Sequence, residues 1–428
     1  MEVNVVLDGP YQNKDFYNFI STSEQPRHQW YYFKEGFSTK LIKEAIAAYP
    51  KKTKLKILDP FSGSGTTVLT SSLLGHSGVG IEVNPFLHFT SEIKTKSWDV
   101  NSKENLVDLE SIIKNSRPGS FSKLEGFSTF TNKDGLDKWL FNTSVLRRYN
   151  SVRENIEKEI EPELRPLFSF ASLIAAMDCS NVKKDGKSVR YKKNWVETAY
   201  SGADFERRFR ELFLKIVTDL EVSPISHKNQ PEIHLSDSRS KLGDKTFKED
   251  GFDLVITSPP YLNSFDYTDI YRPELFLGGF VKDNTELQNL RHQTLRSHVQ
   301  IDWNPKIVYN SNYLTKFRDM VAANKDQLWS KRIPLMIEAY FDDLATVLSE
   351  IKLRMKKGGQ IWLVVSTSAY AGVHIPVDLI IGELGHELGL QLKGIHCLRY
   401  LRTASQQYDQ LKATKAPLRE SLIILERK

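Results

Sequence analysis

The feature that most constrains the fold is a strand, a glycine-containing turn, a helix and a second strand in succession between residues 54 and 82. Residues 54–58 predict the first strand, and residues 67–74 predict a helix that ends at Gly75. Residues 79–81 predict the second strand. A later apolar run, residues 252–256, lacks the alternation of a half-solvated strand and therefore predicts a buried strand of a parallel sheet. The sequence thus predicts an α/β fold.

The turn after the first strand predicts a nucleotide-type pocket. Two closely spaced glycines, Gly63 and Gly65, let the backbone approach a ligand and leave the N-terminus of the following helix accessible. Glu82 ends the second strand, where a carboxylate can accept from both hydroxyls of a ribose. The dinucleotide fingerprint needs a third glycine where this chain has Val68, which disfavours a dinucleotide. A plain glycine turn with a solvent-facing glutamate is the alternative.

A second candidate motif, Ser258-Pro259-Pro260-Tyr261, follows the buried run at residues 252–256. Two prolines remove backbone donors and fix the chain, so that their carbonyls can face a ligand. The ring of Tyr261 adds a flat stacking surface. Together they suit a planar base that carries an exocyclic amino group. A proline turn that merely ends a strand is the alternative interpretation.

Composition sets broader limits. The chain has 428 residues and a formal net charge of +6, a mild excess that permits an anionic partner without requiring one. Cys179 and Cys397 have no metal-ligand spacing, which disfavours a zinc site and a disulfide framework and suits a reducing compartment. The N-terminus lacks a signal-peptide pattern, and no window predicts a membrane span. We therefore expect a cytoplasmic protein with no membrane partner.

Three motifs together resemble the S-adenosylmethionine-dependent amino DNA methyltransferases: residues 59–67, residues 80–85 and residues 257–261. The resemblance implies a Rossmann-like seven-stranded sheet that ends in an antiparallel hairpin, with S-adenosylmethionine as cofactor. It implies Ser258, Pro259, Pro260 and Tyr261 around the target amino group. The cofactor site that it implies consists of Asp59, Phe61, Ser62, Gly63, Ser64, Gly65, Thr66, Glu82 and Asp237. The aromatic segment at residues 32–37 resembles the family motif that closes the cofactor pocket.

The chain divides into a catalytic core and inserted segments. We expect residues 1–27 to form an N-terminal arm, and residues 28–95 and 230–428 to form the core. Residues 96–229 are too long for a connection and predict a mainly helical insertion that recognises DNA. A second insertion is expected at residues 281–331. Its His292 and His298 lack metal-ligand spacing, so we predict no metal and place both on the polar surface.

The final quarter gives the clearest secondary-structure pattern. Apolar residues at spacings of three and four from Ile337 to Met355 predict a long helix ended by Gly358 and Gly359. Residues 360–365 predict a buried strand and residues 376–388 a helix. Residues 392–401 and 421–425 predict the terminal hairpin.

A basic segment within the first insertion predicts contact with nucleic acid. Basic side chains interleaved with aromatic rings suit phosphate contacts and base stacking. A solvated loop is the alternative, because it is the usual place of a run of charges. The candidate contacts are Lys183, Lys184, Lys187, Arg190, Tyr191, Lys192 and Lys193.

The expected activity is transfer of a methyl group to an exocyclic amine of a base flipped out of duplex DNA at a specific sequence. In the family that the chain resembles, a serine at position 258 favours cytosine N4, and the cofactor motif here precedes the catalytic motif, which is that family's unpermuted order. Methylation at carbon-5 would need a thiolate that neither cysteine is placed to supply. The alternatives are an adenine-N6 DNA methyltransferase, an RNA methyltransferase and a non-catalytic nucleic-acid-binding module. The family also implies a cognate restriction nuclease or defence proteins as partners.

Overall fold

The computed structural model describes residues 5–7, 9–17, 20–33, 35–50, 53–116, 121–185, 188–300, 307–401 and 417–428. Its centre is an eight-stranded mixed sheet in the order β1-β11-β12-β8-β7-β2-β3-β6. The strands are β1 (Val5–Val6), β2 (Lys56–Asp59), β3 (Ser77–Glu82), β6 (Glu232–Leu235), β7 (Phe252–Thr257), β8 (Met355–Ser366), β11 (Leu390–Tyr400) and β12 (Arg419–Arg427).

Five neighbouring strands, β8, β7, β2, β3 and β6, run parallel to one another. Strand β12 is antiparallel to both β8 and β11, which forms the predicted terminal pair. Every residue of β7 is buried, as its largely apolar run without alternation predicts. The carboxyl ends of β2, β3, β6 and β7 therefore meet at one edge of the sheet.

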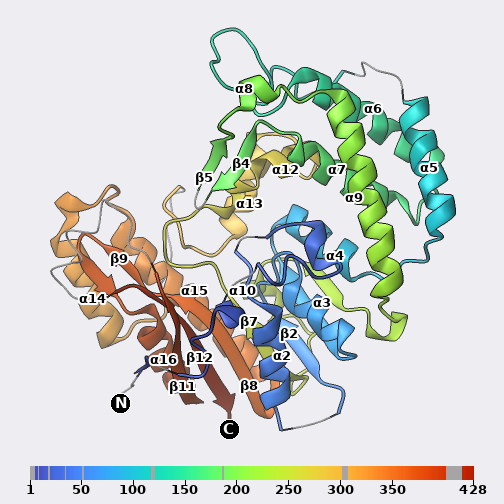
Figure 1. Ribbon diagram of the computed structural model, residues 1–428. Coiled ribbons are helices and arrows are strands. Elements are labelled where there is room, and N and C mark those ends of the chain that lie inside the picture. The colour runs from blue at the N-terminus through green and yellow to red at the C-terminus, as the bar shows by residue number, and fades with distance from the viewer. Residues whose placement is uncertain are drawn as a thin grey trace.

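Helices cover both faces of the sheet (Figure 1). One face packs against α2 (Thr39–Ala48), and its core contains Leu41, Ile57 and Ile256. The side chain of Ser38 accepts from the amide of Lys40 and caps α2. The other face packs against α15 (Ile333–Arg354) and α16 (Val377–Glu387). Helices α3 (Thr66–Leu73) and α4 (Pro85–Thr95) follow β2 and β3.

Most of the segment at residues 96–229 is helical and gathers in the upper part of Figure 1. Its long helices are packed in one core that also includes Trp30, Phe86 and Leu275. The capping box between Ser201 and Asp204 starts the longest of them. The elements are α5 (Ser102–Asn115), α6 (Thr143–Glu159), α7 (Arg165–Asp178), the hairpin of β4 (Val182–Asp185) and β5 (Ser188–Tyr191), α8 (Trp195–Thr198), α9 (Gly202–Val222) and η2 (His227–Asn229).

Short elements complete the chain. Near the N-terminus lie α1 (Lys14–Tyr17) and η1 (His28–Trp30). After β6 comes α10 (Ser238–Lys241). The segment after β7 forms α11 (Tyr267–Ile270), α12 (Arg272–Leu277), α13 (Asn284–Gln293), α14 (Asn312–Ala323) and η3 (Lys325–Gln327), and β9 (Ser368–Tyr370) pairs with β10 (Val373–Ile375).

The predicted α/β sheet with its terminal antiparallel pair is confirmed, with two differences. The short strand β1 pairs with β11 in parallel and adds an eighth strand at one edge. The prediction that Gly358 and Gly359 end the long helix was wrong, because α15 ends at Arg354 and both glycines lie within β8. Gly358 has a φ of 72°, so the pair accommodates an irregularity early in the strand. In the described ranges, no helix has the length and apolar character needed to cross a bilayer.

Candidate active site

A cavity of about 480 Å³ lies at the sheet edge where β2, β3, β6 and β7 end. Both sequence motifs reach it. We call Phe61, Gly63 and Glu82 its glycine-turn side, and the run from Ser258 to Tyr261 its S-P-P-Y side. All of these residues line the same cavity, together with Asp237.

The glycines of the turn are required by their surroundings. Gly63 has a φ of 51° and Gly65 a φ of 84°, which is the left-handed region that other residues rarely adopt. A Cβ at Gly65 would lie 2.4 Å from Oγ of Ser91, and one at Gly63 would lie 2.9 Å from the ring of Phe33. The chain therefore passes too close to α4 and to the aromatic segment for any side chain here.

The carboxylate of Glu82 is oriented by two backbone amides. Its Oε2 accepts from the amide of Gly63 at 2.7 Å, and its Oε1 accepts from the amide of Asn84 at 2.8 Å. Burial raises the pKa of this carboxyl to about 7, although the hydrogen bonds from both amides lower it. Each oxygen keeps a lone pair for a ligand hydroxyl. Glu82 thus supplies a fixed acceptor at the cavity wall.

Asp59 joins strands β2 and β7 rather than lining the cavity. Its Oδ1 accepts from the hydroxyl of Thr257 at 2.6 Å and from the amide of Phe61 at 3.1 Å. Burial raises the pKa of this carboxyl to about 6. Its contacts hold the glycine turn and the start of the S-P-P-Y run in register.

The S-P-P-Y side of the cavity begins where β7 ends. The hydroxyl of Tyr261 donates to Oε1 of Glu420, which lies on β12, at 2.8 Å. Oγ of Ser258 lies 3.4 Å from the hydroxyl oxygen of Tyr261 and donates to it. The tyrosine is thus held at its far end, so that its ring keeps a defined position beside the two prolines.

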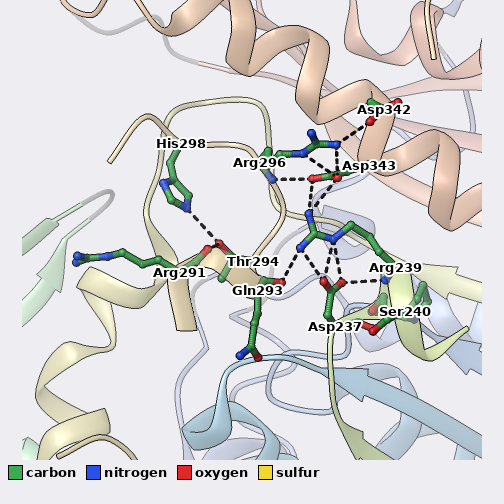
Figure 2. Close-up of polar contacts among 12 residues, drawn as sticks. Asp237, Arg239, Ser240, Arg291, Gln293, Thr294, Arg296, His298, Asp342 and Asp343 are labelled. Atoms are coloured by element: carbon green, nitrogen blue, oxygen red, sulfur yellow. Dashed lines mark hydrogen bonds and ion pairs between the residues drawn. The ribbon is translucent and has the colours of Figure 1, made fainter. Parts of the chain in front are cut away.

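Asp237 reaches the cavity from the carboxyl end of β6, the last strand of the sheet, and Figure 2 shows its partners. The guanidinium of Arg239 binds both of its carboxylate oxygens at 2.7–3.0 Å. Arg239 also binds both carboxylate oxygens of Asp343, on α15, at 2.9 and 3.0 Å. Asp343 and Asp342 in turn bind Arg296. This network fixes the chain around Gln293 and Arg296 over the cavity.

Comparisons with known proteins agree with this arrangement. The DNA methylase family (N6_N4_Mtase) matches residues 8–92. The Type II methyltransferase M.AvaI of Nostoc sp. is 26% identical over 404 residues, which cover 88% of this chain and 82% of that protein. The Type II methyltransferase M.BsoBI of Geobacillus stearothermophilus is 25% identical over 475 residues, which cover 99% of this chain and 90% of that protein. The Type II methyltransferase M.MvaI of Kocuria varians is 25% identical over 395 residues, which cover 87% of this chain and 84% of that protein.

These matches support an amino DNA methyltransferase family for this chain. The cofactor of this family is S-adenosylmethionine. Among solved structures, a methyltransferase from Methanosarcina mazei covers 89% of this chain and 96% of its own with 9% identity and a TM-score of 0.30, a likeness too low to support an argument.

The cavity of this methyltransferase fits that cofactor. Glu82 offers a carboxylate for ribose hydroxyls, and the rings of Phe33 and Phe61 offer apolar walls for a flat base. The buried hydroxyls of Ser62 and Ser64 have no hydrogen-bond partner in the described residues, which leaves polar groups behind the turn for a ligand or for water.

Several residues predicted to bind the cofactor surround the cavity without lining it: Asp59, Ser62, Ser64, Gly65 and Thr66. Gly65 precedes the first residue of α3, where its left-handed conformation turns the chain into the helix. Their roles are therefore to shape the turn that carries Phe61 and Gly63. Their direct contact with cofactor stays a prediction.

Other residues at the cavity of the methyltransferase were not predicted from the sequence. Glu420 and Arg399 come from the terminal strands, and the segment at residues 293–298 comes from the second insertion. The expectation that His298 lies on the polar surface was wrong, because the residue is 1% exposed and lines the cavity. No local pattern marks these residues, since they reach the site only through the tertiary fold.

The basic hairpin of the methyltransferase contributes fewer exposed charges than its sequence suggests. Lys184 is an internal residue: its ammonium lies 2.5 Å from the carboxylate of Glu274 and 3.7 Å from the ring centre of Tyr271. It is therefore engaged within the protein instead of facing phosphate. Lys192 donates to the carbonyl oxygen of Asp178 at 2.7 Å.

The remaining candidates of the hairpin differ in exposure. Lys183, Arg190 and Lys193 are exposed. The ring of Tyr191 is partly buried and packs at 5.6 Å from that of Trp195. Lys187 lies outside the described residues. Contact of this surface with nucleic acid remains a prediction.

Neither cysteine is among the residues that line the cavity of the methyltransferase. Both cysteines are buried, and neither forms a disulfide within the described residues. Burial raises the pKa of the Cys179 thiol to about 12, which keeps it protonated at neutral pH. No group of three or more potential metal ligands occurs among the residues that the structure describes.

Proposed function

We propose that this chain transfers a methyl group from S-adenosylmethionine to the exocyclic N4 of a cytosine in duplex DNA. The observation that carries the proposal is that one cavity is lined both by the glycine-turn side and by the S-P-P-Y side. A cofactor held by Phe61, Gly63 and Glu82 would therefore share its space with a base held by Ser258, Pro259 and Tyr261. Asp237 is assigned to the amino group of the cofactor's adenine.

The cofactor supplies an activated methyl group, so the protein is left with the task of orientation. An exocyclic amine is a poor nucleophile because its lone pair is delocalised into the ring. Hydrogen bonds from its two hydrogens to the carbonyl of Pro259 and the hydroxyl of Ser258 favour tetrahedral nitrogen and aim the lone pair out of the ring plane. Tyr261 stacks on the base. The target must leave the duplex to reach this site.

Cytosine is preferred over adenine because position 258 is a serine, which in this family is associated with N4 methylation. The relatives named above are Type II methyltransferases, and we infer that this chain too recognises a specific duplex sequence. We further infer a cognate restriction nuclease or defence protein as its partner in the cell.

The test is methyl transfer from labelled cofactor to unmethylated plasmid DNA, followed by mass spectrometry of the nucleosides. We expect N4-methylcytosine, and we expect Ser258→Ala and Tyr261→Ala to abolish most of it. Ser240→Ala is a matched control, because its hydroxyl is exposed and donates to the backbone carbonyl oxygen of Asp237 instead of lining the cavity. N6-methyladenine would refute the assignment of the base, and label found only in RNA would refute the assignment of the substrate. Cofactor binding without transfer would indicate a non-catalytic binding module.

A further inference from the structure

The S-P-P-Y side of the cavity is connected to an ion pair on the terminal strands, whose carboxylate is buried. Glu420, on β12, has a side chain that is 7% exposed and accepts from the hydroxyl of Tyr261 at 2.8 Å. Arg399, on β11, donates to the same carboxylate through Nε at 2.7 Å and through Nη2 at 3.2 Å. The guanidinium also lies over the ring of Tyr17, 4.9 Å from its centre. The ion pair therefore contacts a tyrosine at each end, Tyr261 at Glu420 and Tyr17 at Arg399.

This arrangement fixes which groups donate. Arginine has donors only, and the carboxylate that it binds has acceptors only, so the hydroxyl proton of Tyr261 must point to Glu420. Burial raises the pKa of Tyr261 well above its ordinary value, with the charge of Glu420 as the next cause, so the phenol keeps this proton. The lone pairs of its oxygen remain for another donor.

That donor is Ser258. Its hydroxyl lies 3.4 Å from the oxygen of Tyr261, and since the tyrosine proton is already committed, the serine proton points to the tyrosine. The lone pairs of the serine oxygen are then free on the side that lines the cavity. A serine hydroxyl can otherwise donate or accept, because its proton rotates to suit its neighbours.

We propose that Glu420 is a positioning residue that acts through the hydroxyl of Tyr261 to hold Ser258 as a hydrogen-bond acceptor for the target amino group. The inference rests on the proposed function, because an amine that must keep its lone pair for the methyl group needs acceptors around its hydrogens. An acidic side chain at position 258 would accept without help. A serine needs its proton directed elsewhere, and the Arg399–Glu420–Tyr261 chain directs it.

The test is a double-mutant cycle between Glu420→Gln and Ser258→Ala, measured as the single-turnover rate of methyl transfer to unmethylated plasmid DNA. A glutamine can donate to the tyrosine oxygen, which turns the tyrosine proton toward Ser258 and the serine proton toward the amine. We expect Glu420→Gln to lower the rate by about 10- to 100-fold, which is less than the roughly 100- to 1,000-fold cost of removing a group that contacts the reacting atoms directly, because Glu420 acts through Tyr261. Cofactor affinity and the KM for DNA should stay within about twofold.

The second arm of the cycle separates positioning from general structural support. In the Ser258→Ala background there is no hydroxyl to orient, so adding Glu420→Gln should slow transfer by less than about twofold. Tyr261→Phe, which removes the connecting hydroxyl, should match Glu420→Gln and provides a second route if the glutamine variant fails to fold. Glu426→Gln is the matched control, because it lies on the same strand and bonds Gln360 and Lys393 instead.

The outcomes distinguish the two proposals. Two results would refute the positioning role while the proposed function stands, provided that the native protein methylates DNA. In the first, the Glu420→Gln protein methylates at the native rate. In the second, Glu420→Gln slows transfer by the same factor in the native protein and in the Ser258→Ala protein. If the native protein binds cofactor and methylates no DNA amine, the proposed function fails and the role of Glu420 fails with it.

Discussion

The two sides of the cavity are held in different ways. On the glycine-turn side, Glu82 is bound by the amides of Gly63 and Asn84, which lie within 19 residues of it in the sequence. On the S-P-P-Y side, Tyr261 is bound by Glu420, which lies 159 residues away. The first side is therefore built by one strand–helix–strand unit. The second is complete only when the terminal strands join the sheet.

Because the two sides are held in different ways, cofactor binding and orientation of the target base should be separable by mutation. A change on the glycine-turn side should affect cofactor affinity and leave the tyrosine in place. A change among the terminal strands should affect orientation of the base and leave cofactor affinity in place.

The largest effect is expected from Glu82→Ala, which removes the acceptor of the glycine-turn side. Loss of charge-assisted hydrogen bonds to two hydroxyls should weaken cofactor binding about 100-fold, at about 1.5 kcal/mol for each bond. Isothermal titration calorimetry with S-adenosylmethionine measures this change. Glu92→Ala is the control, because that carboxylate is half exposed and pairs with His88. Equal affinity of the native and Glu82→Ala proteins would contradict the assignment.

A second test breaks the geometry of the same side. Gly65→Ala should lower stability by about 2–4 kcal/mol, because the new Cβ meets Ser91 at 2.4 Å and the φ of 84° is unfavourable for alanine. Gly75→Ala is a matched control with a φ of 83° and open space around its Cβ position, so it should cost only about 1–2 kcal/mol. Chemical denaturation of the two variants measures the difference. Similar losses would show that the close contact with α4 carries no cost.

A third test uses pH. The ionised form of Glu82 accepts more strongly from ribose hydroxyls, and its pKa is about 7. Lowering the pH from 8 to 6 should therefore protonate most of the carboxyl and weaken cofactor binding about tenfold. Asp59 and Lys94 have pKa values of about 6 and 7 and titrate in the same range. Glu82→Gln separates the contribution of Glu82 from theirs. Cofactor binding by this variant should be weaker than that of the native protein and should vary little with pH. If its pH profile matches that of the native protein, another group causes the effect.

The smallest effect is expected outside both sides of the cavity, on the basic hairpin. Replacing Lys183 and Lys193 by alanine should weaken DNA binding only a few-fold and lower the slope of log affinity against log salt by about 1–2. Fluorescence anisotropy at several salt concentrations measures the slope. Lys184→Ala should instead reduce stability, because it leaves the buried carboxylate of Glu274 without its cation. An unchanged salt slope for the double variant would remove this hairpin from the DNA interface.

Local patterns predicted much of this molecule. The glycine turn and the strand ending in Glu82 both follow from contacts between residues close in sequence, and the structure has each of them. The S-P-P-Y run shares a crevice with the turn because the carboxyl ends of parallel strands meet at one edge. Both motifs line one cavity.

The sequence by itself determined the α/β architecture and the motifs, because hydrophobic periodicity and turn chemistry act over a few residues. It did not determine which charges remain exposed. Lys184 looks like its neighbours in a basic run, and only packing against α12 pairs it with Glu274. Likewise, only the pairing of β12 with β8 and β11 brings Glu420 and Arg399 to Tyr261. Such contacts join residues far apart in the chain, so the tertiary structure alone decides them.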